Sequence, residues 1–137
     1  MKKTIIAALC AFMATAVYAD VVKKEDLIVW DRTDVAGGVG TLDGRFAFKR
    51  DASPETYAIK EIGYLTLEPG ESIGYHKHEN NEDAYIIISG EGTFKDADGI
   101  EYPVKAGDVT IVRGGQSHGL TNTGKENLVI LDVIAQK

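Results

Sequence analysis

The segment GESIGYHKHENNEDAYIIISG, residues 70–90, decides which fold the sequence predicts. It holds two histidines separated by one residue, His76 and His78, and two neighbouring acidic residues, Glu82 and Asp83. Side chains two positions apart on a strand leave the same face, so both imidazoles can reach one metal ion. A histidine pair of this kind is too short to be specific by itself, and the residues around it therefore decide.

Two segments with fixed spacings contain all three histidines of the chain. In the first, five residues separate Gly70 from His76, four separate His78 from Asp83, and six separate Asp83 from Gly90. In the second, the order is Gly107, five residues, Arg113, Gly114, Gly115, two residues, His118, three residues and Asn122.

This pair of segments resembles the two motifs of the cupin superfamily. The resemblance covers about residues 70–122 and implies an all-β fold, a single small cupin barrel of the jelly-roll type. In that superfamily the first motif supplies two histidines and a glutamate to a metal, and the second motif supplies a third histidine. The resemblance therefore implies that His76, His78 and His118 are metal ligands together with one carboxylate.

The identity of that carboxylate stays open between two residues. The spacing to Gly90 places Asp83 at the position of the family's glutamate, with Glu82 one residue earlier. Strand alternation does not decide, because the residues that would share a face with either acid are apolar. We expect Asp83 to be the ligand. A bulge near Asn80 and Asn81 would instead turn Glu82 inward.

The first 19 residues read as an export signal. Lys2 and Lys3 precede an apolar run from Ile5 to about Val17, and small residues follow around Ala19, after which we expect cleavage. The apolar run is shorter than the roughly 20 residues of a membrane-spanning helix. The mature protein is therefore expected to be periplasmic or secreted, without a stable membrane anchor.

Three histidines and a carboxylate form a mixed nitrogen and oxygen ligand set that suits Mn, Fe, Ni, Cu or Zn without selecting among them. Such a set leaves positions open for water, oxygen or substrate, as Lewis-acid or oxygen-activating chemistry requires. Folding outside the cytosol would favour Cu or Zn, because these ions lead the general order of affinity.

Removal of the signal changes the cysteine count and the charge. It takes away Cys10, the only cysteine, so no disulfide is expected in the mature domain. It also leaves 13 of the 15 basic residues against all 21 acidic ones, a formal net charge of −8 instead of −6. This balance argues against nucleic acid as a partner, because binding polyphosphate requires a basic surface. A neutral or cationic small molecule is easier to accommodate.

The rest of the chain reads as short strands and turns, with residues 20–57 as a lead-in and residues 58–137 as the barrel core. We expect one short strand in Asp20–Trp30 and a loop over the glycine-rich segment Val35–Gly44. No stretch after residue 20 shows helical periodicity over several turns. The other expected elements are strands in Ala58–Leu67, Tyr85–Ile88, Val109–Val112 and Leu128–Ile134 and a hairpin turn at Asp98-Gly99.

The expected chemistry runs through the metal. The mature chain has no cysteine and commits its histidines to the ion, so no base remains for a Ser/His/Asp mechanism. We expect a metal-dependent enzyme acting on a small molecule, of the oxygenase, isomerase, decarboxylase or lyase type that the resemblance implies. The alternative is a non-catalytic module that binds a sugar, an aromatic acid or only the metal. Polar groups that could enter the barrel, none with an assigned catalytic role, are Tyr64, Tyr75, Tyr85 and Gln116.

The resemblance also suggests a homodimer, because small single-barrel cupins often pair edge strands. Barrel edges need covering, and the lead-in segment Val21–Trp30 could supply a strand that is exchanged between two copies.

Overall fold

Antiparallel strands make up most of the computed structural model, which describes residues 20–137. The strands are β1 Ile28–Val29, β2 Arg32–Thr33, β3 Thr41–Phe48, β4 Ile59–Leu67, β5 Ser72–Lys77, β6 Glu82–Ser89, β7 Glu91–Lys95, β8 Glu101–Lys105, β9 Val109–Val112, β10 Ser117–Thr121 and β11 Leu128–Ala135. Within these residues the only helical elements are three 3-10 turns, η1 Lys24–Asp26, η2 Val35–Gly37 and η3 Arg50–Ala52. The all-β class expected from the sequence is confirmed.

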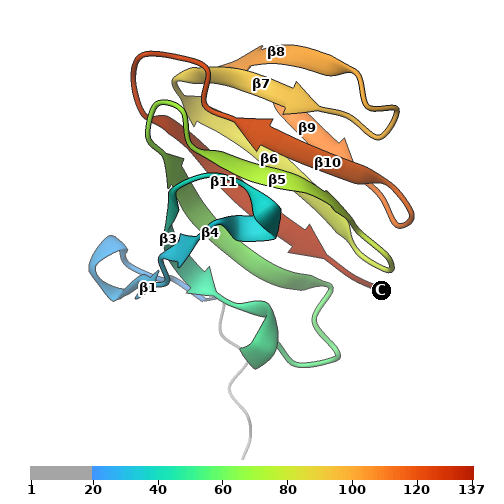
Figure 1. Cartoon of the computed structure of the whole chain (residues 1–137). Coiled ribbons are helices and arrows are strands. Elements are labelled where there is room, and N and C mark those ends of the chain that lie inside the picture. The colour runs from blue at the N-terminus through green and yellow to red at the C-terminus, as the bar shows by residue number, and fades with distance from the viewer. Residues whose placement is uncertain (1–19) are drawn as a thin grey trace, which may run out of the picture.

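The strands form two sheets that wrap around one interior as a jelly-roll barrel (Figure 1). The larger sheet has the order β1-β3-β4-β11-β6-β9, with β2 also paired to β3, and the smaller sheet has the order β5-β10-β7-β8. The C-terminal strand β11 lies between β4 and β6 and pairs with both along nearly its whole length. The last strand of the chain is therefore an interior strand of the larger sheet.

Alternation of side chains along the strands fills the interior of the barrel. On β11, Leu128, Ile130, Asp132 and Ile134 are buried, and the residues between them are partly exposed. Burial of apolar surface stabilises the fold by about 25 cal/mol per Å². The most deeply buried apolar side chains of both sheets are Phe46, Leu42, Leu65, Leu67, Ile87, Leu120, Leu128, Ile130 and Val112.

The expected strands correspond to β4, β6, β9 and β11, and the expected hairpin turn joins β7 to β8 with Gly99 at φ 82°. The expectation of a loop from Val35 to Gly44 is wrong for its second half, because β3 already begins at Thr41. Leu42 is only 2% exposed in the core, and β3 pairs with β4 from Asp43 onward. Core packing and strand pairing thus outweigh the glycine content of this segment.

The export signal predicted for residues 1–19, with Cys10 and cleavage after Ala19, lies outside the described residues, so export stays a prediction. In the part from residue 20 onward, no helix combines the length and the apolar character needed to cross a membrane. In the lead-in segment, Ile28 and Val29 form β1 and pair with β3 of the same chain. The homodimer, and the strand exchange suggested for it, also stay predictions.

Candidate metal centre

The smaller sheet positions the three histidines. His76 on β5 and His118 on β10 are Cα partners in the antiparallel register. His78 directly follows β5, and its backbone bonds to the turn before β10: its N–H donates to Gln116 O at 2.9 Å and its carbonyl accepts from Gly115 N at 2.6 Å. Gly115 has φ 90°, a conformation that glycine adopts without steric cost. The two sequence motifs are therefore joined through their backbones, which brings the three imidazoles together.

Asp83 approaches the histidines from the larger sheet. It lies on β6, is 3% exposed, and its Oδ2 is 3.4 Å from the Nε2 atoms of both His78 and His118. Glu82 is exposed, and its carboxylate pairs with Arg113 at 3.0 Å. β6 keeps a regular register with β9 and β11 at these two acids, so no bulge turns Glu82 inward. The structure places Asp83, and not Glu82, beside the histidines.

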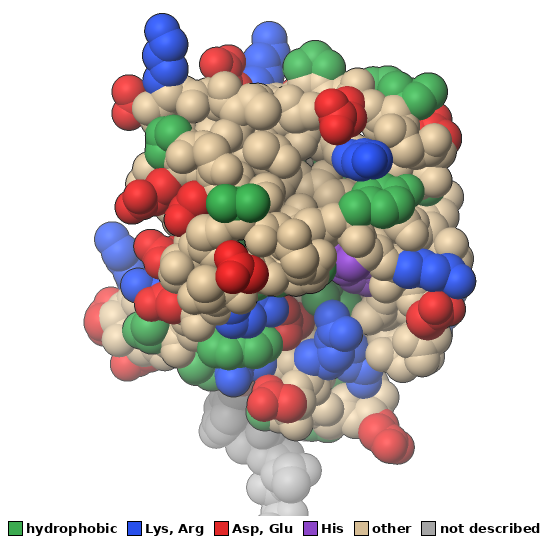
Figure 2. All heavy atoms as spheres, viewed as in Figure 1, with side chains coloured by type: hydrophobic (Ala, Val, Ile, Leu, Met, Phe, Trp, Pro, Cys, Tyr) green, Lys and Arg blue, Asp and Glu red, His purple; other side chains and the backbone are tan. Residues whose placement is uncertain are grey.

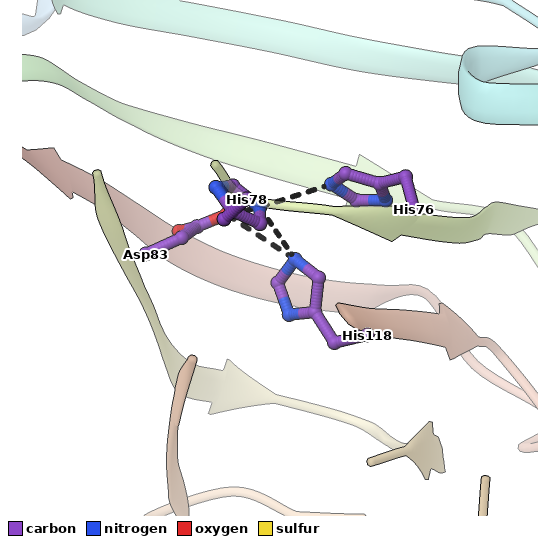
Figure 3. Close-up of side chains that lie close together, drawn as sticks. All are labelled: His76, His78, Asp83 and His118. Atoms are coloured by element: carbon purple, nitrogen blue, oxygen red, sulfur yellow. Dashed lines mark hydrogen bonds and ion pairs between the residues drawn. The ribbon is translucent and has the colours of Figure 1, made fainter. Parts of the chain in front are cut away.

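The four side chains converge on one point (Figure 3). The Nε2 atom of His78 lies 3.1 Å from the Nε2 atoms of both His76 and His118. One potential ligand atom from each of the four residues lies within 4.8 Å of the others. Metal–ligand bonds of roughly 2.1 Å at tetrahedral angles would separate the ligand atoms by roughly 3.4 Å, so an ion fits among them.

Hydrogen bonds on the far side of two rings fix which nitrogen faces the centre. Nδ1 of His76 donates to the carbonyl oxygen of Gly74 at 2.8 Å, because a carbonyl can only accept. Nδ1 of His78 likewise donates to Oδ1 of Asn81 at 2.8 Å. In the neutral rings both Nε2 atoms then present lone pairs to each other at 3.1 Å. A metal ion between two facing lone pairs would bind both of them, so the donor set fits a divalent metal.

A second buried carboxyl group, Asp132 on β11, lies beside Asp83. The Oδ1 atoms of both residues lack a hydrogen-bond donor among the described residues. Burial, and after it the charge of Asp83, raises the pKa of Asp132 well above its usual value. Burial acts the same way on Asp83, but contacts with His118 and Asp132 outweigh it and lower the pKa of Asp83. A protonated Asp132 thus supplies the missing donor, while Asp83 stays the anion that a metal requires.

Burial also favours the neutral forms of His76 and Tyr85. It lowers the pKa of His76, to which the charges of the neighbouring histidines add, and it raises the pKa of Tyr85 well above its usual value. The Tyr85 ring stacks on His118 with centroids 4.7 Å apart, and its hydroxyl is 3.3 Å from His118 Nε2. Tyr85 is therefore a neutral hydroxyl beside the histidines. Three further polar groups considered from the sequence lie outside the wall of this site: Tyr64, Tyr75 and Gln116.

His76, His78 and Asp83 line a cavity of about 420 Å³. Figure 2 shows a histidine at the bottom of a hollow in the surface, with Lys and Arg side chains beside it. The sequence pattern assigns no role to several charged residues of the cavity wall: Arg32, Arg50, Glu61, Lys77 and Asp132. Glu61 and Asp132 occupy interior positions of β4 and β11. Alternation along these strands predicts that both positions are buried, and an acid at a buried position indicates a functional role. This signal could have identified Glu61 and Asp132 from the sequence.

Similarity to known proteins agrees with the geometry of the site. A family model described as the Cupin domain matches residues 63–134. The Oxalate-binding protein of Thermotoga maritima is 34% identical over 114 residues, which make up 83% of this chain and 92% of that protein. Auxin-binding protein 1 of Arabidopsis thaliana is 29% identical over 84 residues, which make up 56% of this chain and 42% of that protein.

A solved structure has the same fold over most of the chain. The crystal structure of a protein from Thermotoga maritima, described as a predicted oxalate decarboxylase, has a TM-score of 0.77 at 33% identity and covers 86% of this chain and 100% of that one. The family model reaches from within β4 to β11 and includes all four converging residues. From the family model and the extent of these similarities together, the chain belongs to the cupin family.

Proposed function

We propose that the protein holds a divalent transition metal with His76, His78, His118 and Asp83, and that this metal centre binds a small carboxylate of the oxalate type. The observation that carries the proposal is the convergence of four ligand atoms, with two imidazole lone pairs 3.1 Å apart. When bound, the ion would supply a Lewis acid that attracts carboxylate oxygens. The ligand set suits Mn, Fe, Ni, Cu or Zn.

Two observations support a carboxylate as the ligand. The relative that is 34% identical over 83% of this chain is named Oxalate-binding protein. The cavity beside the histidines has four acids in its wall and also three basic side chains, of which Lys77 pairs with Glu79 while Arg32 and Arg50 form no ion pair among the described residues. The acidic balance of the whole chain favours a neutral or cationic ligand, but charges more than about 10 Å away are largely screened at physiological salt. The groups nearest the ligand therefore decide its charge.

The chain's own residues prepare the site for such a ligand. Asn81 and the Gly74 carbonyl hold His78 and His76 with their lone pairs toward the centre. Tyr85 keeps its hydroxyl proton, because burial raises its pKa, and this hydroxyl can donate to an anion beside the histidines. Apolar residues of the core form one side of the wall and exclude water from that side: Leu42, Leu65, Ile73 and Ile134.

Metal and ligand titrations test the proposal directly. Protein stripped with a chelator is titrated calorimetrically with Zn²⁺ and with Mn²⁺, and the loaded protein is then titrated with oxalate. We expect one ion per chain, and oxalate binding only after the metal is bound. His78→Ala and Asp83→Asn should lose the metal, and Glu82→Gln, the neighbouring exposed acid, should keep it. Absence of metal binding, or equal oxalate binding with and without metal, would contradict the proposal.

Decarboxylation of oxalate is a second candidate function, favoured by the similarity to the structure described as a predicted oxalate decarboxylase. This reaction breaks the carbon–carbon bond of the oxalate monoanion and yields carbon dioxide and formate without an external oxidant. Formate release by the loaded protein, absent in His78→Ala, would support an enzyme. Oxalate binding without formate release would support a binding module.

A further inference from the structure

Arg32 is a basic residue of the cavity wall without an acidic partner. It lies on β2, which pairs with β3 through Arg32 and Leu42, and it lines the same cavity as His76 and Asp83. Its Nε is buried and has no hydrogen-bond partner. None of the ion pairs within residues 20–137 includes it. A buried donor without an acceptor is costly, which indicates an acceptor that comes from outside the chain.

Two aromatic rings hold the guanidinium group in place. Its Cζ lies over the Trp30 ring, 4.0 Å from the centroid, and 5.7 Å from the centroid of Phe46. The two rings contact each other with centroids 5.5 Å apart. A guanidinium that is stacked on a ring keeps the N–H groups at its edge available for hydrogen bonds. Such a fixed fork matches a carboxylate, which can accept two parallel hydrogen bonds.

The four acids in the cavity wall are engaged elsewhere, and one of them, Glu79, forms an ion pair with Lys77 at 3.4 Å. Glu61, 4% exposed, accepts a hydrogen bond from the backbone N–H of Arg50 at 3.2 Å. Asp83 contacts the histidines, and Asp132 lies beside Asp83 and forms no ion pair with Arg32. The guanidinium therefore keeps its hydrogen-bonding capacity within the cavity.

We propose that Arg32 is the anion-recognition residue of this cavity and binds the carboxylate oxygens that the metal leaves free, so that the site prefers dicarboxylates to monocarboxylates. This inference rests on the proposed metal-dependent binding and names the ligand class that the site selects. A dicarboxylate has acceptor oxygens for both the metal and the guanidinium, whereas a monocarboxylate serves only one of them well. The competing role for Arg32 is to offset the charge of the buried acid Glu61 inside the folded protein.

Cobalt(II)-loaded protein tests the assignment, because its visible spectrum changes when even a weak ligand reaches the metal. Wild type, Arg32→Gln and Arg32→Lys are each titrated with oxalate and with acetate. We expect Arg32→Gln to weaken oxalate binding by about 10- to 100-fold, the range of a hydrogen bond to a charged group, and acetate binding by less than about threefold. Arg32→Lys keeps the charge but loses the planar fork, so it should recover only part of the loss.

Arg45→Gln is the matched control. Arg45 lies on β3, pairs with Asp31 at 2.7 Å and is absent from the cavity wall. The substitution removes the same charge from the chain, so a local role for Arg32 predicts wild-type oxalate affinity in this variant. Equal weakening in Arg45→Gln and Arg32→Gln would overturn the assignment, because it would reflect net charge alone.

Other outcomes distinguish a failure of the role assigned to Arg32 from a failure of the proposed metal-dependent binding. Unchanged oxalate affinity in Arg32→Gln, or equal losses for oxalate and acetate, would overturn the role of Arg32. A lower melting temperature and weaker cobalt binding, with no change in ligand preference, would identify an internal counter-charge and overturn it as well. Failure of wild type to bind cobalt, or of the loaded wild type to bind oxalate, overturns the proposed function and the inference with it.

Discussion

The barrel interior has an apolar region and a polar region, and β11 runs through both. At its start, Leu128 and Ile130 are 0% and 1% exposed within the hydrophobic core. Two positions further along the same face, Asp132 is 3% exposed and lies beside Asp83. The two regions are equally buried but have opposite chemistry. Burial alone therefore does not distinguish a structural residue from a functional one. The hydrogen-bond partners of each buried polar group make that distinction.

Buried polar groups are paired in one region and left without partners in the other. Asn122, 1% exposed, donates to the carbonyl oxygens of Leu67 and Glu126 at 2.8 Å and accepts a backbone N–H at 3.0 Å. In the polar region, Nε of Arg32 is buried and has no hydrogen-bond partner among the described residues. An unpaired buried group costs about 1–3 kcal/mol. Asn122 thus serves the fold, whereas the polar region is arranged for a species that the chain itself does not provide.

The largest expected effect on stability lies in the apolar region. Leu128→Ala should lower the free energy of unfolding by about 2–5 kcal/mol, because it removes packed methyl groups and leaves a cavity. Urea denaturation of the metal-free protein measures this loss. The metal affinity of the variant should stay within about twofold of wild type, since the two regions have separate functions and distant sites act nearly independently. A parallel fall in metal affinity would show that the regions are coupled.

In the polar region, His118→Ala should remove metal binding. Loss of a residue that only supports a ligand costs about 10- to 100-fold in affinity, and loss of the ligand itself should exceed that range. Competition with a chromophoric chelator gives the affinity. The free energy of unfolding of the metal-free variant should change much less than in Leu128→Ala. A large loss of stability in the metal-free variant, with metal affinity retained, would show that His118 serves the fold and not the metal site.

A smaller change in affinity is expected from Asn81→Ala. The Asn81 side chain holds Nδ1 of His78 at 2.8 Å and so fixes the ring for metal binding. Its removal should weaken metal binding by about 10-fold, at the lower end of the range for outer ligand partners. Asn80→Ala is the control, because Asn80 is an exposed neighbour in the same wall. Equal affinities in the two variants would exclude this role for Asn81.

The pH dependence of stability distinguishes the regions further. Burial lowers the pKa of His76 below its usual value of 6.5, so the unfolded metal-free protein binds more protons than the folded protein just below pH 6.5. The free energy of unfolding should have its full value above pH 6.5. Below that pH the titration of His76 should lower it by at most about 1.4 kcal/mol per pH unit.

Thermal denaturation of metal-free wild type and His76→Gln between pH 7.5 and 5.5 isolates this effect. The difference between the two is needed, because Asp132 has a raised pKa and gives a slope of opposite sign. Wild type should lose stability relative to His76→Gln as the pH falls. Parallel curves would show that His76 titrates as it does in the unfolded chain.

The smallest expected effect is that of Glu82→Gln. The Glu82 pair with Arg113 at 3.0 Å is exposed on both sides, and exposed ion pairs contribute about 0–1 kcal/mol. Metal affinity and melting temperature should both stay close to wild type. Loss of metal in this variant, with Asp83→Asn unaffected, would move the carboxylate ligand to Glu82.

Motif spacing together with the family resemblance was sufficient to predict which residues converge, although the pairing of β10 with β5 that brings His118 opposite His76 is a long-range contact that the spacing alone does not give. The choice between Asp83 and Glu82 could be argued from spacing, and the structure places Asp83 inside. Their role as metal ligands stays a prediction. Arg32 could not be predicted, because it lies on a strand of two residues that shows no alternation, and only the pairing with β3 carries it to the cavity.

The wrong loop boundary has a similar cause. Gly44 looks like a loop residue in the sequence but lies inside β3. A side chain at this position would collide with the carbonyl oxygen of Trp30 and with the Phe46 ring. Glycine is therefore required there by a close approach of the lead-in segment to the strand, which becomes visible only when both are in place. Local composition cannot distinguish that reason from a turn.

The backbone bonds between His78 and the turn before β10 join positions far apart in the chain. His78 and His118 are 40 residues apart in the sequence, and an ion held by both would act as a reversible cross-link. A covalent link closing a loop of that length lowers the entropy of the unfolded chain by an amount worth about 4 kcal/mol. The described residues contain no cysteine. A chelator would therefore break this cross-link, whereas a reductant would have no effect on it. The lifetime of the folded protein would then depend on the concentration of metal available to it.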